Sequence, residues 1–274
     1  MFPTGIRPCN VLKCLSLALL ISGALKTHGQ DSDTIPCNDS VAPLIYRIPL
    51  ADTMFTFHWH NPEATELMLL VIHDDENTSS EVGYSSMHQY GASLLEKKYN
   101  QQYLFRMNFN REEYMFNPNR IFNASGLRNN MLKIGNYSDT ARWLIGQVAS
   151  QVAGAFFQDQ KFIVALHNNN DLGFSILSYI TDTTLMNLTD SIFINPEIDP
   201  DDFFYVTDPE HFRILRNAGF NVVLQSCDMS TDDGSLSYWC VRNRIPYVNI
   251  EAEHLHHTEQ LFMLDVLYDL IIRK

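Results

Sequence analysis

Two histidines and a glutamate stand where buried strands are predicted to end. His73 directly follows the apolar run 69–72, and Glu76 comes three residues later; a second apolar run, 161–166, leads into His167. In an open α/β sheet, ligands bind at the carboxyl ends of the strands. Two imidazoles and one carboxylate are ligands of catalytic zinc sites that leave one position open for water. We therefore predict one Zn²⁺ ion on His73, Glu76 and His167.

Hydrolysis at such a site also needs a general base. In the predicted strand 245–252 and the residue after it, side chains alternate, so Asn249, Glu251 and Glu253 share one face. A carboxylate in an otherwise apolar strand is costly unless it has a partner or a role. Glu251 is the predicted base and Glu253 the second candidate. Alternatively, both lie in the loop after the strand, hydrogen-bonded to the histidines of 254–257.

Several arginines and asparagines could bind the substrate. A guanidinium beside a metal can stabilise an oxyanion, or hold a carboxylate through two parallel hydrogen bonds. Arg120 is the first candidate for both roles, with Asn119 directly before it. Arg106 and Arg111 are further candidates for the anion-binding pocket, and Asn168 adds an amide after the second apolar run. A surface ion pair is the alternative for each arginine, above all for Arg111.

Together, these motifs resemble the succinylglutamate desuccinylase and aspartoacylase branch of the zinc carboxypeptidase superfamily. That branch has a His-x-x-Glu, an Asn-Arg followed closely by Phe, and a Leu-His-Asn in this order, with a catalytic Glu on a late strand. The corresponding segments here are 73–76, 119–122 and 166–168, and the matches extend from His73 to Glu253.

The resemblance implies zinc on His73, Glu76 and His167, substrate binding by Asn119 and Arg120, and a catalytic glutamate at Glu251 or Glu253. It also implies a fold with a mixed, mainly parallel sheet between helices.

The chain also departs from the family. Asp74 and Asp75 occupy the place where a glycine is common within the His-x-x-Glu, and the segment after the catalytic glutamate lacks the glycine-proline character of the aspartoacylases. The additional small domain of those acylases has no counterpart. These differences affect the expected substrate more than the metal.

We therefore expect a zinc-dependent hydrolase that cleaves an amide bond in a small N-acyl amino acid or a peptide. The nearest alternative is a carboxypeptidase acting on peptides or peptidoglycan stems, because the same centre serves both reactions. The alternative from another class is a secreted binding protein that has the fold without turnover.

Strands and helices alternate along the chain. The predicted strands are 45–48, 54–59, 66–72, 103–109, 161–166, 191–194, 203–206, 221–224 and 245–252. The predicted helices are 80–99, 139–157, 209–217 and 256–272. For helix 139–157 we predict Asp139 as the N-cap and an inner stripe that includes Trp143 and Val148. This alternation predicts an α/β fold with a mixed, mainly parallel sheet covered by helices on both faces.

The first residues have the features of a secretory signal peptide. Arg7 and Lys13 precede the apolar run 14–25, and polar or small residues follow it. The run is too short to span a bilayer comfortably, and no later segment reaches spanning length. We predict a signal peptide over 1–29, a polar segment over 30–43 and a single catalytic domain over 44–274 of a secreted, extracellular protein. An uncleaved membrane anchor is the alternative.

The chain is acidic. Its formal net charge is −13, and removal of the three cations Arg7, Lys13 and Lys26 with the signal peptide makes it −16. Such a charge disfavours nucleic acid and anionic membranes as partners.

Secretion also affects the expected state of the cysteines and sequons. Of the cysteines, Cys37, Cys227 and Cys240 follow the signal peptide. An odd number in an oxidising compartment predicts one disulfide and a free thiol, or an intermolecular bond. A Cys227–Cys240 bond is favoured, and a bond from Cys37 to either is the alternative.

Five sequons predict a glycoprotein: Asn38, Asn77, Asn123, Asn136 and Asn187. Asn77 is expected to be unmodified, because a glycan there would crowd Glu76.

Overall fold

The computed structural model describes residues 42–170 and 173–274. The predicted signal peptide, most of the polar segment 30–43, Cys37 and Asn38 lie outside these residues. Residues Val41–Lys274 form one compact unit. Within the described ranges, no helix has both the length and the apolar character needed to cross a membrane.

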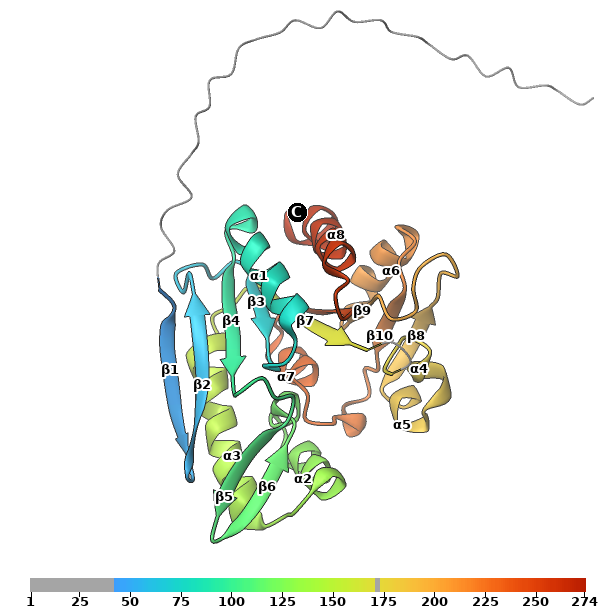
Figure 1. Cartoon of the computed structure of the whole chain (residues 1–274). Coiled ribbons are helices and arrows are strands. Elements are labelled where there is room, and N and C mark those ends of the chain that lie inside the picture. Colours follow the sequence, from blue (N-terminus) through green and yellow to red (C-terminus); the bar gives the residue numbers. More distant parts are fainter. Residues whose placement is uncertain (1–41, 171–172) are drawn as a thin grey trace, which may run out of the picture. The chain divides into compact units, whose positions relative to one another are not determined.

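A mixed sheet forms the centre of this unit (Figure 1). Its strands are β1 (Leu44–Leu50), β2 (Thr53–His60), β3 (Met68–Val71), β4 (Ser93–Lys98), β7 (Ile163–Asn169), β8 (Thr189–Phe193), β9 (Phe203–Val206), β10 (Val222–Gln225) and β11 (Tyr247–Glu253). They lie in the order β1-β2-β4-β3-β7-β11-β9-β10-β8. The neighbours β4, β3, β7 and β11 run parallel to one another. Strand β2 pairs antiparallel with both β1 and β4, β8 pairs antiparallel with β10, and β9 pairs antiparallel with β11. Strands β5 (Phe105–Phe109) and β6 (Glu112–Phe116) form a separate hairpin.

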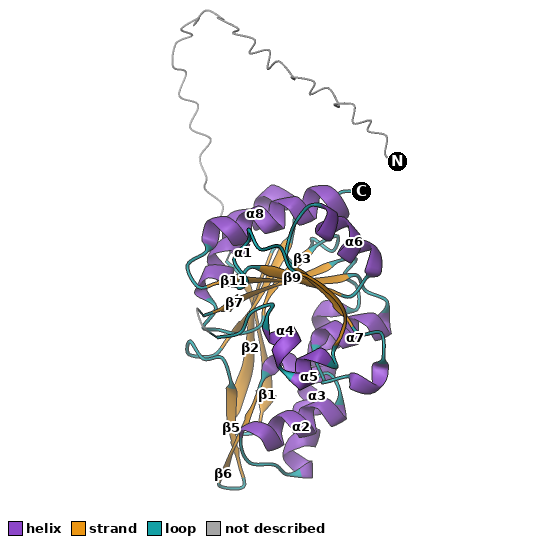
Figure 2. Ribbon diagram, turned by 90° about the vertical axis from the view of Figure 1, so that its right-hand side faces the viewer, coloured by secondary structure: helices purple, strands orange, loops and turns teal. Residues whose placement is uncertain are grey.

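Helices cover both faces of the sheet (Figure 2). They are α1 (Asn77–Tyr90), α2 (Ala124–Ile134), α3 (Asp139–Val152), α4 (Ser178–Thr181), α5 (Thr183–Met186), α6 (Pro209–Asn217), α7 (Leu236–Asn243) and α8 (His257–Leu267). Strand β3 shows why two layers are needed. Leu69 packs in a cluster with residues of α1, α6 and α8, whereas Leu70 packs on the other side with residues of α2, α3 and α7. Successive side chains of a strand point to opposite faces, so an apolar strand is buried from both sides. The predicted fold class is confirmed.

The predicted helix 80–99 is wrong in its second half. Helix α1 ends at Tyr90, where Gly91 adopts a left-handed conformation (φ 60°) that caps the helix. Residues Ser93–Lys98 then form β4, between β2 and β3. The charged residues Glu96 and Lys97 of this strand are both fully buried. Their tertiary partners therefore override the local pattern.

The predicted helix 139–157 exists, and Val148 is buried as predicted, but Trp143 is not part of the inner face. It comprises α3 and the π-helical turn Ala153–Phe157. Ser138, not Asp139, is the N-cap, because its side chain accepts a hydrogen bond from the backbone of Ala141. Trp143 is 57% exposed, whereas Ile145 faces the core. The small Ala141 allows close packing against the sheet, which an apolarity pattern dominated by large side chains does not reveal.

The favoured Cys227–Cys240 disulfide is wrong for the described part of the chain, where both thiols are free. Cys240 points from α7 into the core, and Cys227 lies on an exposed loop after β10. The two side chains thus occupy different environments.

Candidate metal site and catalytic cavity

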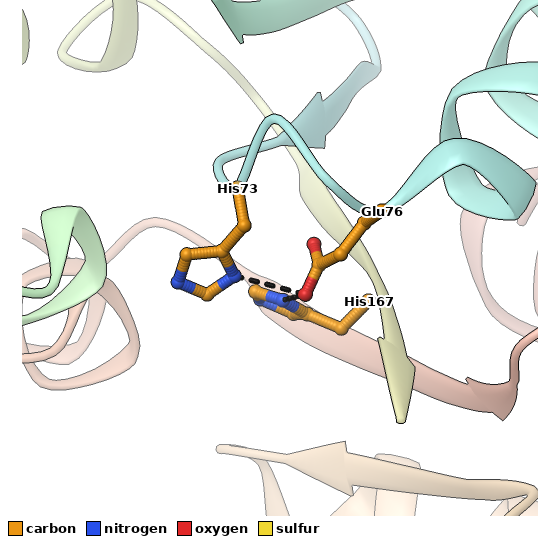
Figure 3. Close-up of side chains that lie close together, drawn as sticks. All are labelled: His73, Glu76 and His167. Atoms are coloured by element: carbon orange, nitrogen blue, oxygen red, sulfur yellow. Dashed lines mark hydrogen bonds and ion pairs between the residues drawn. The ribbon is translucent and has the colours of Figure 1, made fainter. Parts of the chain in front are cut away.

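The predicted ligands converge on one point at the carboxyl edge of the sheet (Figure 3). His73 follows β3, Glu76 directly precedes α1, and His167 lies in β7. The Nδ1 atoms of His73 and His167 lie 2.9 and 3.0 Å from the same Oε1 atom of Glu76. Because β3 and β7 are parallel neighbours, residues at their carboxyl ends meet at the same edge. All three side chains are buried.

The donor set fits a zinc ion. One ligand atom from each of His73, Glu76 and His167 lies within 4.8 Å of the others. Oε2 of Glu76 is buried without a hydrogen-bond partner among the described residues. Buried polar atoms are normally paired, so this oxygen is available to a bound cation. Two imidazoles and a carboxylate match the protein ligands of catalytic zinc sites.

The charges of the three ligands are tightly coupled. Burial alone would raise the pKa of Glu76, but His167 and His73 lower it to about 2. Burial alone would lower the pKa of His167, but Glu76 raises it to about 9. Without metal, the carboxylate and a protonated imidazole therefore stabilise each other. Metal binding must displace that proton.

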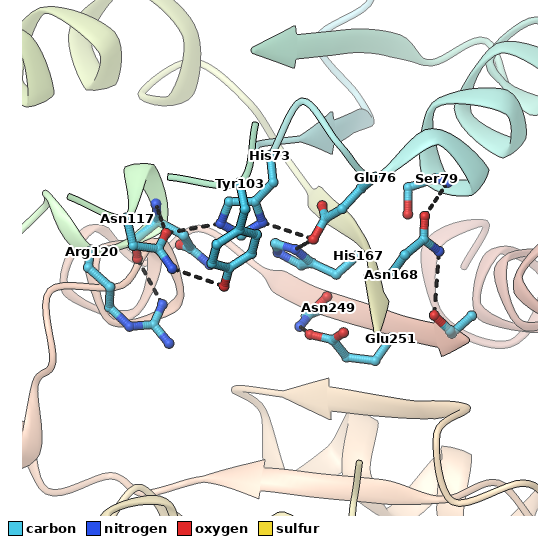
Figure 4. Close-up of polar contacts among 12 residues, drawn as sticks. His73, Glu76, Ser79, Tyr103, Asn117, Arg120, His167, Asn168, Asn249 and Glu251 are labelled. Carbon is cyan, nitrogen blue, oxygen red and sulfur yellow. Dashed lines mark hydrogen bonds and ion pairs between the residues drawn. The ribbon is translucent and has the colours of Figure 1, made fainter. Parts of the chain in front are cut away.

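The ring of His73 is held from its other side by Asn117 (Figure 4). Its Nε2 lies 2.9 Å from Oδ1 of Asn117, and Oδ1 also accepts a hydrogen bond from the backbone of Asn119. An amide oxygen only accepts, so Nε2 bears a proton, and Nδ1 faces Glu76, with a lone pair whenever the ring is neutral. Tyr103 stacks on the ring at a centroid distance of 3.9 Å and accepts a hydrogen bond from Nδ2 of Asn117. A cation between the lone pair and the carboxylate would stabilise this arrangement.

A cavity of 660 Å³ opens beside the three ligands. Glu251 lies in its wall on β11, where it pairs in register with His167 of the neighbouring strand β7. Nδ2 of Asn249 donates to Oε1 of Glu251 at 2.9 Å. Burial raises the pKa of the Glu251 carboxyl, and the nearby Glu76 adds to this effect. A buried, oriented carboxyl with a raised pKa suits proton transfer.

Glu253, the second candidate for the base, has a different environment. It does not line the cavity and is half-buried. Its Oε2 lies 3.3 Å from Nε2 of His256 in an ion pair. The structure therefore places only Glu251 beside the ligands.

Arg120 and Asn119 lie in the opposite wall, in the 3₁₀ turn Pro118–Arg120. Nε of Arg120 lies 2.9 Å from Oδ2 of Asp233, and Nη1 donates to the backbone oxygen of Asn119 at 2.9 Å. Burial opposes the charged guanidinium, but Asp233 outweighs it and raises the pKa of Arg120. Oδ1 of Asn119 accepts from the backbone of Leu236 at 3.1 Å, and its amide nitrogen has no partner among the described residues, so it can donate to a ligand.

The other predicted substrate-binding residues differ in position. Asn168 lines the cavity, but its amide joins the backbones of Ser79 (2.9 Å) and Ala252 (3.4 Å). Arg106 lies outside the cavity, on the exposed β5–β6 hairpin, in a 3.0 Å ion pair with Glu113. Arg111 lies in the turn of that hairpin and is also outside the cavity. The structure thus brings neither Arg106 nor Arg111 to the ligands.

Several cavity residues were not predicted from the sequence: Tyr103, Tyr179, Tyr205 and Asp233. Asn117, which holds His73, was also missed. Asn117 lies three residues before Arg120, so proximity to the Asn-Arg motif was an available signal. Asp233 lies in a polar turn, and no local pattern places it beside Arg120.

Comparison with protein-family models found no match, and comparison with curated proteins found none either. The chain is similar to solved structures at low identity. One is a succinylglutamate desuccinylase/aspartoacylase from Rhodobacter sphaeroides (13% identity, TM-score 0.43), covering 84% of this chain and 64% of that one. A second is the succinylglutamate desuccinylase from Chromobacterium violaceum (15% identity, TM-score 0.42), covering 85% and 73%. A third is bovine thrombin-activatable fibrinolysis inhibitor (8% identity, TM-score 0.43), covering 84% and 89%. The similar structures thus include the branch that the sequence motifs resemble.

Proposed function

We propose that this protein is a zinc-dependent hydrolase that cleaves an amide bond in a small N-acyl amino acid or a peptide. The convergence of His73, Glu76 and His167 beside Glu251, in one cavity, supports this proposal most directly. An isolated ligand cluster would suit a structural metal, but structural zinc sites are usually closed by four protein ligands. Here three candidate ligands adjoin an open cavity, as in catalytic sites.

Each residue has a distinct role in the proposed reaction. When bound, zinc supplies a Lewis acid and lowers the pKa of a coordinated water. Glu251 accepts the proton of the attacking water and then donates it to the leaving amine. Asn249 keeps the Glu251 carboxyl oriented toward the cavity. Arg120 binds the substrate carboxylate or stabilises the oxyanion, and Asn119 donates from its free amide nitrogen.

The nearest alternative is a carboxypeptidase for peptides or peptidoglycan stems. The same ligands, base and arginine would serve it, and a cavity of 660 Å³ can accept more than one amino acid. A screen of the zinc-loaded protein against N-acyl amino acids, short peptides and stem peptides separates the two substrate classes.

Metal analysis and two matched variants test the proposal. We expect one zinc per chain in the purified protein, and loss of zinc in His167→Ala. Glu251→Gln is expected to retain zinc but lose turnover by at least about 10³-fold, whereas Glu253→Gln stays near wild type. Absence of zinc binding, or binding without hydrolysis of any screened amide, would instead favour a binding protein with this fold.

We also propose that the protein is secreted after cleavage near Gly29. The basic residues and short apolar run at the N-terminus support this proposal. N-terminal sequencing of the protein recovered from the medium of a secreting host tests it. An intact N-terminus inside the cell would contradict it.

A further inference from the structure

The wall of the cavity that contains Arg120 has three tyrosines with unused hydroxyl groups. Tyr179 lies in α4, Tyr205 in β9 and Tyr247 in β11. They are only 7%, 7% and 2% exposed, respectively. Among the described residues, none donates to or accepts a hydrogen bond from these hydroxyls, although other buried tyrosines, such as Tyr238, are bonded. All three tyrosines line the cavity, and their hydroxyl oxygens are not among the fully buried polar atoms, so each hydroxyl can donate to or accept from a ligand in the cavity.

The tyrosines lie near the ion pair of Arg120 and Asp233, and Tyr179 and Tyr247 also lie near Glu251. Burial raises the pKa of Tyr205, and both Asp233 and Arg120 lie near enough to influence it further. Oδ2 of Asp233 faces Nε of Arg120 at 2.9 Å, and its Oδ1 accepts from the backbone of Ser235 at 3.0 Å. Both carboxylate oxygens are therefore already bonded. This end of the cavity therefore offers hydroxyl groups beside an ion pair whose opposite charges balance each other.

From this arrangement we infer that Tyr179, Tyr205 and Tyr247 form a specificity subsite for an uncharged polar side chain, one with an amide or a hydroxyl group. The inference rests on the proposed function, because the side chain belongs to the amino acid that Arg120 and Asn119 hold. Each tyrosine hydroxyl can both donate and accept a hydrogen bond, which matches a carboxamide or an alcohol.

The same contacts disfavour the other classes of side chain. An aliphatic side chain would leave the hydroxyls buried and unpaired, and sites built to hydrogen-bond a substrate discriminate strongly against analogues that lack the bonding group. An acidic side chain would meet the carboxylate of Asp233. A basic side chain would meet Arg120 and would find both oxygens of Asp233 already bonded.

Four substrates of similar size test the subsite: the N-acetyl derivatives of glutamine, glutamate, lysine and leucine, each also presented as the last residue of a tripeptide. We expect kcat/KM for glutamine to exceed that for each of the others by at least about 10-fold, the discrimination expected from one net hydrogen bond. Equal or faster hydrolysis of the leucine or glutamate compounds would overturn the inference.

Tyrosine-to-phenylalanine variants identify the groups responsible. Tyr205→Phe and Tyr179→Phe retain the ring and are each expected to reduce the glutamine-to-leucine ratio by about 5- to 10-fold. Tyr46→Phe is the matched control, because the Tyr46 hydroxyl also has no bonded partner among the described residues but lies outside the cavity, against Trp59 and Phe156. An unchanged ratio in both cavity variants contradicts the role of the hydroxyls.

A binding measurement separates this inference from the proposed function. Calorimetry of L-glutamine and L-leucine with zinc-loaded Glu251→Gln reports on the subsite without turnover. Tighter binding of glutamine supports the subsite even if the wild type hydrolyses none of the compounds, in which case only the proposed function fails. Equal binding, or no binding of either, overturns the subsite even in an active enzyme.

Discussion

Asn117 connects the metal site to the wall of the cavity. Its side chain bonds the ring of His73, accepts from the backbone of Asn119 and donates to Tyr103. Groups that orient a metal-binding histidine affect both metal affinity and ring position. One amide thus determines which nitrogen of His73 faces Glu76, and it also fixes the start of the turn that presents Arg120.

We predict that Asn117→Leu lowers zinc affinity by about 10- to 100-fold, because the ring of His73 loses its orienting acceptor. Asn117→Asp retains an acceptor and is expected to keep an affinity close to wild type. Competition with a chromophoric chelator measures both constants. An unchanged affinity in a folded Asn117→Leu protein would show that the contact does not orient the ligand.

Glu96 provides a test of stability that is independent of the metal site. It is fully buried in β4, with His60 at 3.2 Å and Lys98 at 2.8 Å from its carboxylate. Burial alone would raise the pKa of Glu96, but hydrogen bonds from His60 and Lys98 lower it from 4.5 to about 2. Because the folded-state pKa is depressed, the carboxylate stabilises the fold above pH 4.5, and this contribution is lost as pH falls toward 2.

Glu96→Gln is therefore expected to reduce the free energy of unfolding at pH 7 by about 2–3 kcal/mol. The difference from wild type should shrink progressively between about pH 4.5 and pH 2, where the wild-type carboxylate becomes protonated. Urea unfolding at pH 7, 4 and 3 measures it. A difference that does not change with pH would mean that the charge of Glu96 contributes nothing.

At the scale of elements, helix α2 and the loop before α7 fit together with almost no space between them. A Cβ atom at Gly126 would lie 2.2 Å from the carbonyl carbon of Asp233 and from the nitrogen of Gly234. The backbone of Phe122 donates to the oxygen of Gly234 at 2.9 Å. Since Asp233 holds Arg120, this close approach of two backbones determines where the guanidinium lies.

We predict that Gly126→Ala reduces the free energy of unfolding by about 2–3 kcal/mol, because the backbones must separate. Gly146→Ala, within α3, is the matched control. A Cβ there has nothing within 4 Å, and removal of glycine from the helix is expected to stabilise the protein by about 0.5–1 kcal/mol. Denaturant unfolding of both variants measures the difference. Similar effects of the two substitutions would contradict the tight contact at Gly126.

For the whole molecule, we predict that zinc raises the thermal stability of the fold. A ligand at about 1,000 times its Kd that binds only the native state adds about 4 kcal/mol. For a domain of this size, that corresponds to an increase in Tm of about 8–16 °C. Scanning calorimetry with excess zinc and with a chelator measures the shift. His167→Ala should show no such shift, and an equal shift in that variant would place the ion elsewhere.

Much of the fold could be predicted from local patterns. Helix 209–217 has the bounds that the structure gives α6, because Asp208 caps it and proline occupies its first turn. Strand β4 was missed because Glu96 and Lys97 are buried by partners from distant segments. Gly91, which ends α1, is the residue in the sequence that indicates the break between helix and strand.

The residues of the candidate site that lie at or near the ends of strands could be predicted from the sequence. His167 and Glu251 belong to two adjacent parallel strands, and His73 comes two residues after the third, so their positions along the strands were sufficient to predict them. Asp233 and Tyr205 depend on how distant segments pack, which periodicity does not reveal. Arg106 was misplaced because hairpin β5–β6 lies outside the main sheet.

The separation of the ligands along the chain has a consequence for folding. Glu76 and His167 are 91 residues apart in the chain and meet only when the centre of the sheet has assembled. Such distant contacts form late in folding, because a long loop must close first. Zinc binding during refolding would therefore report when the central strands come together. Its rate can be compared with the rate at which the helices form.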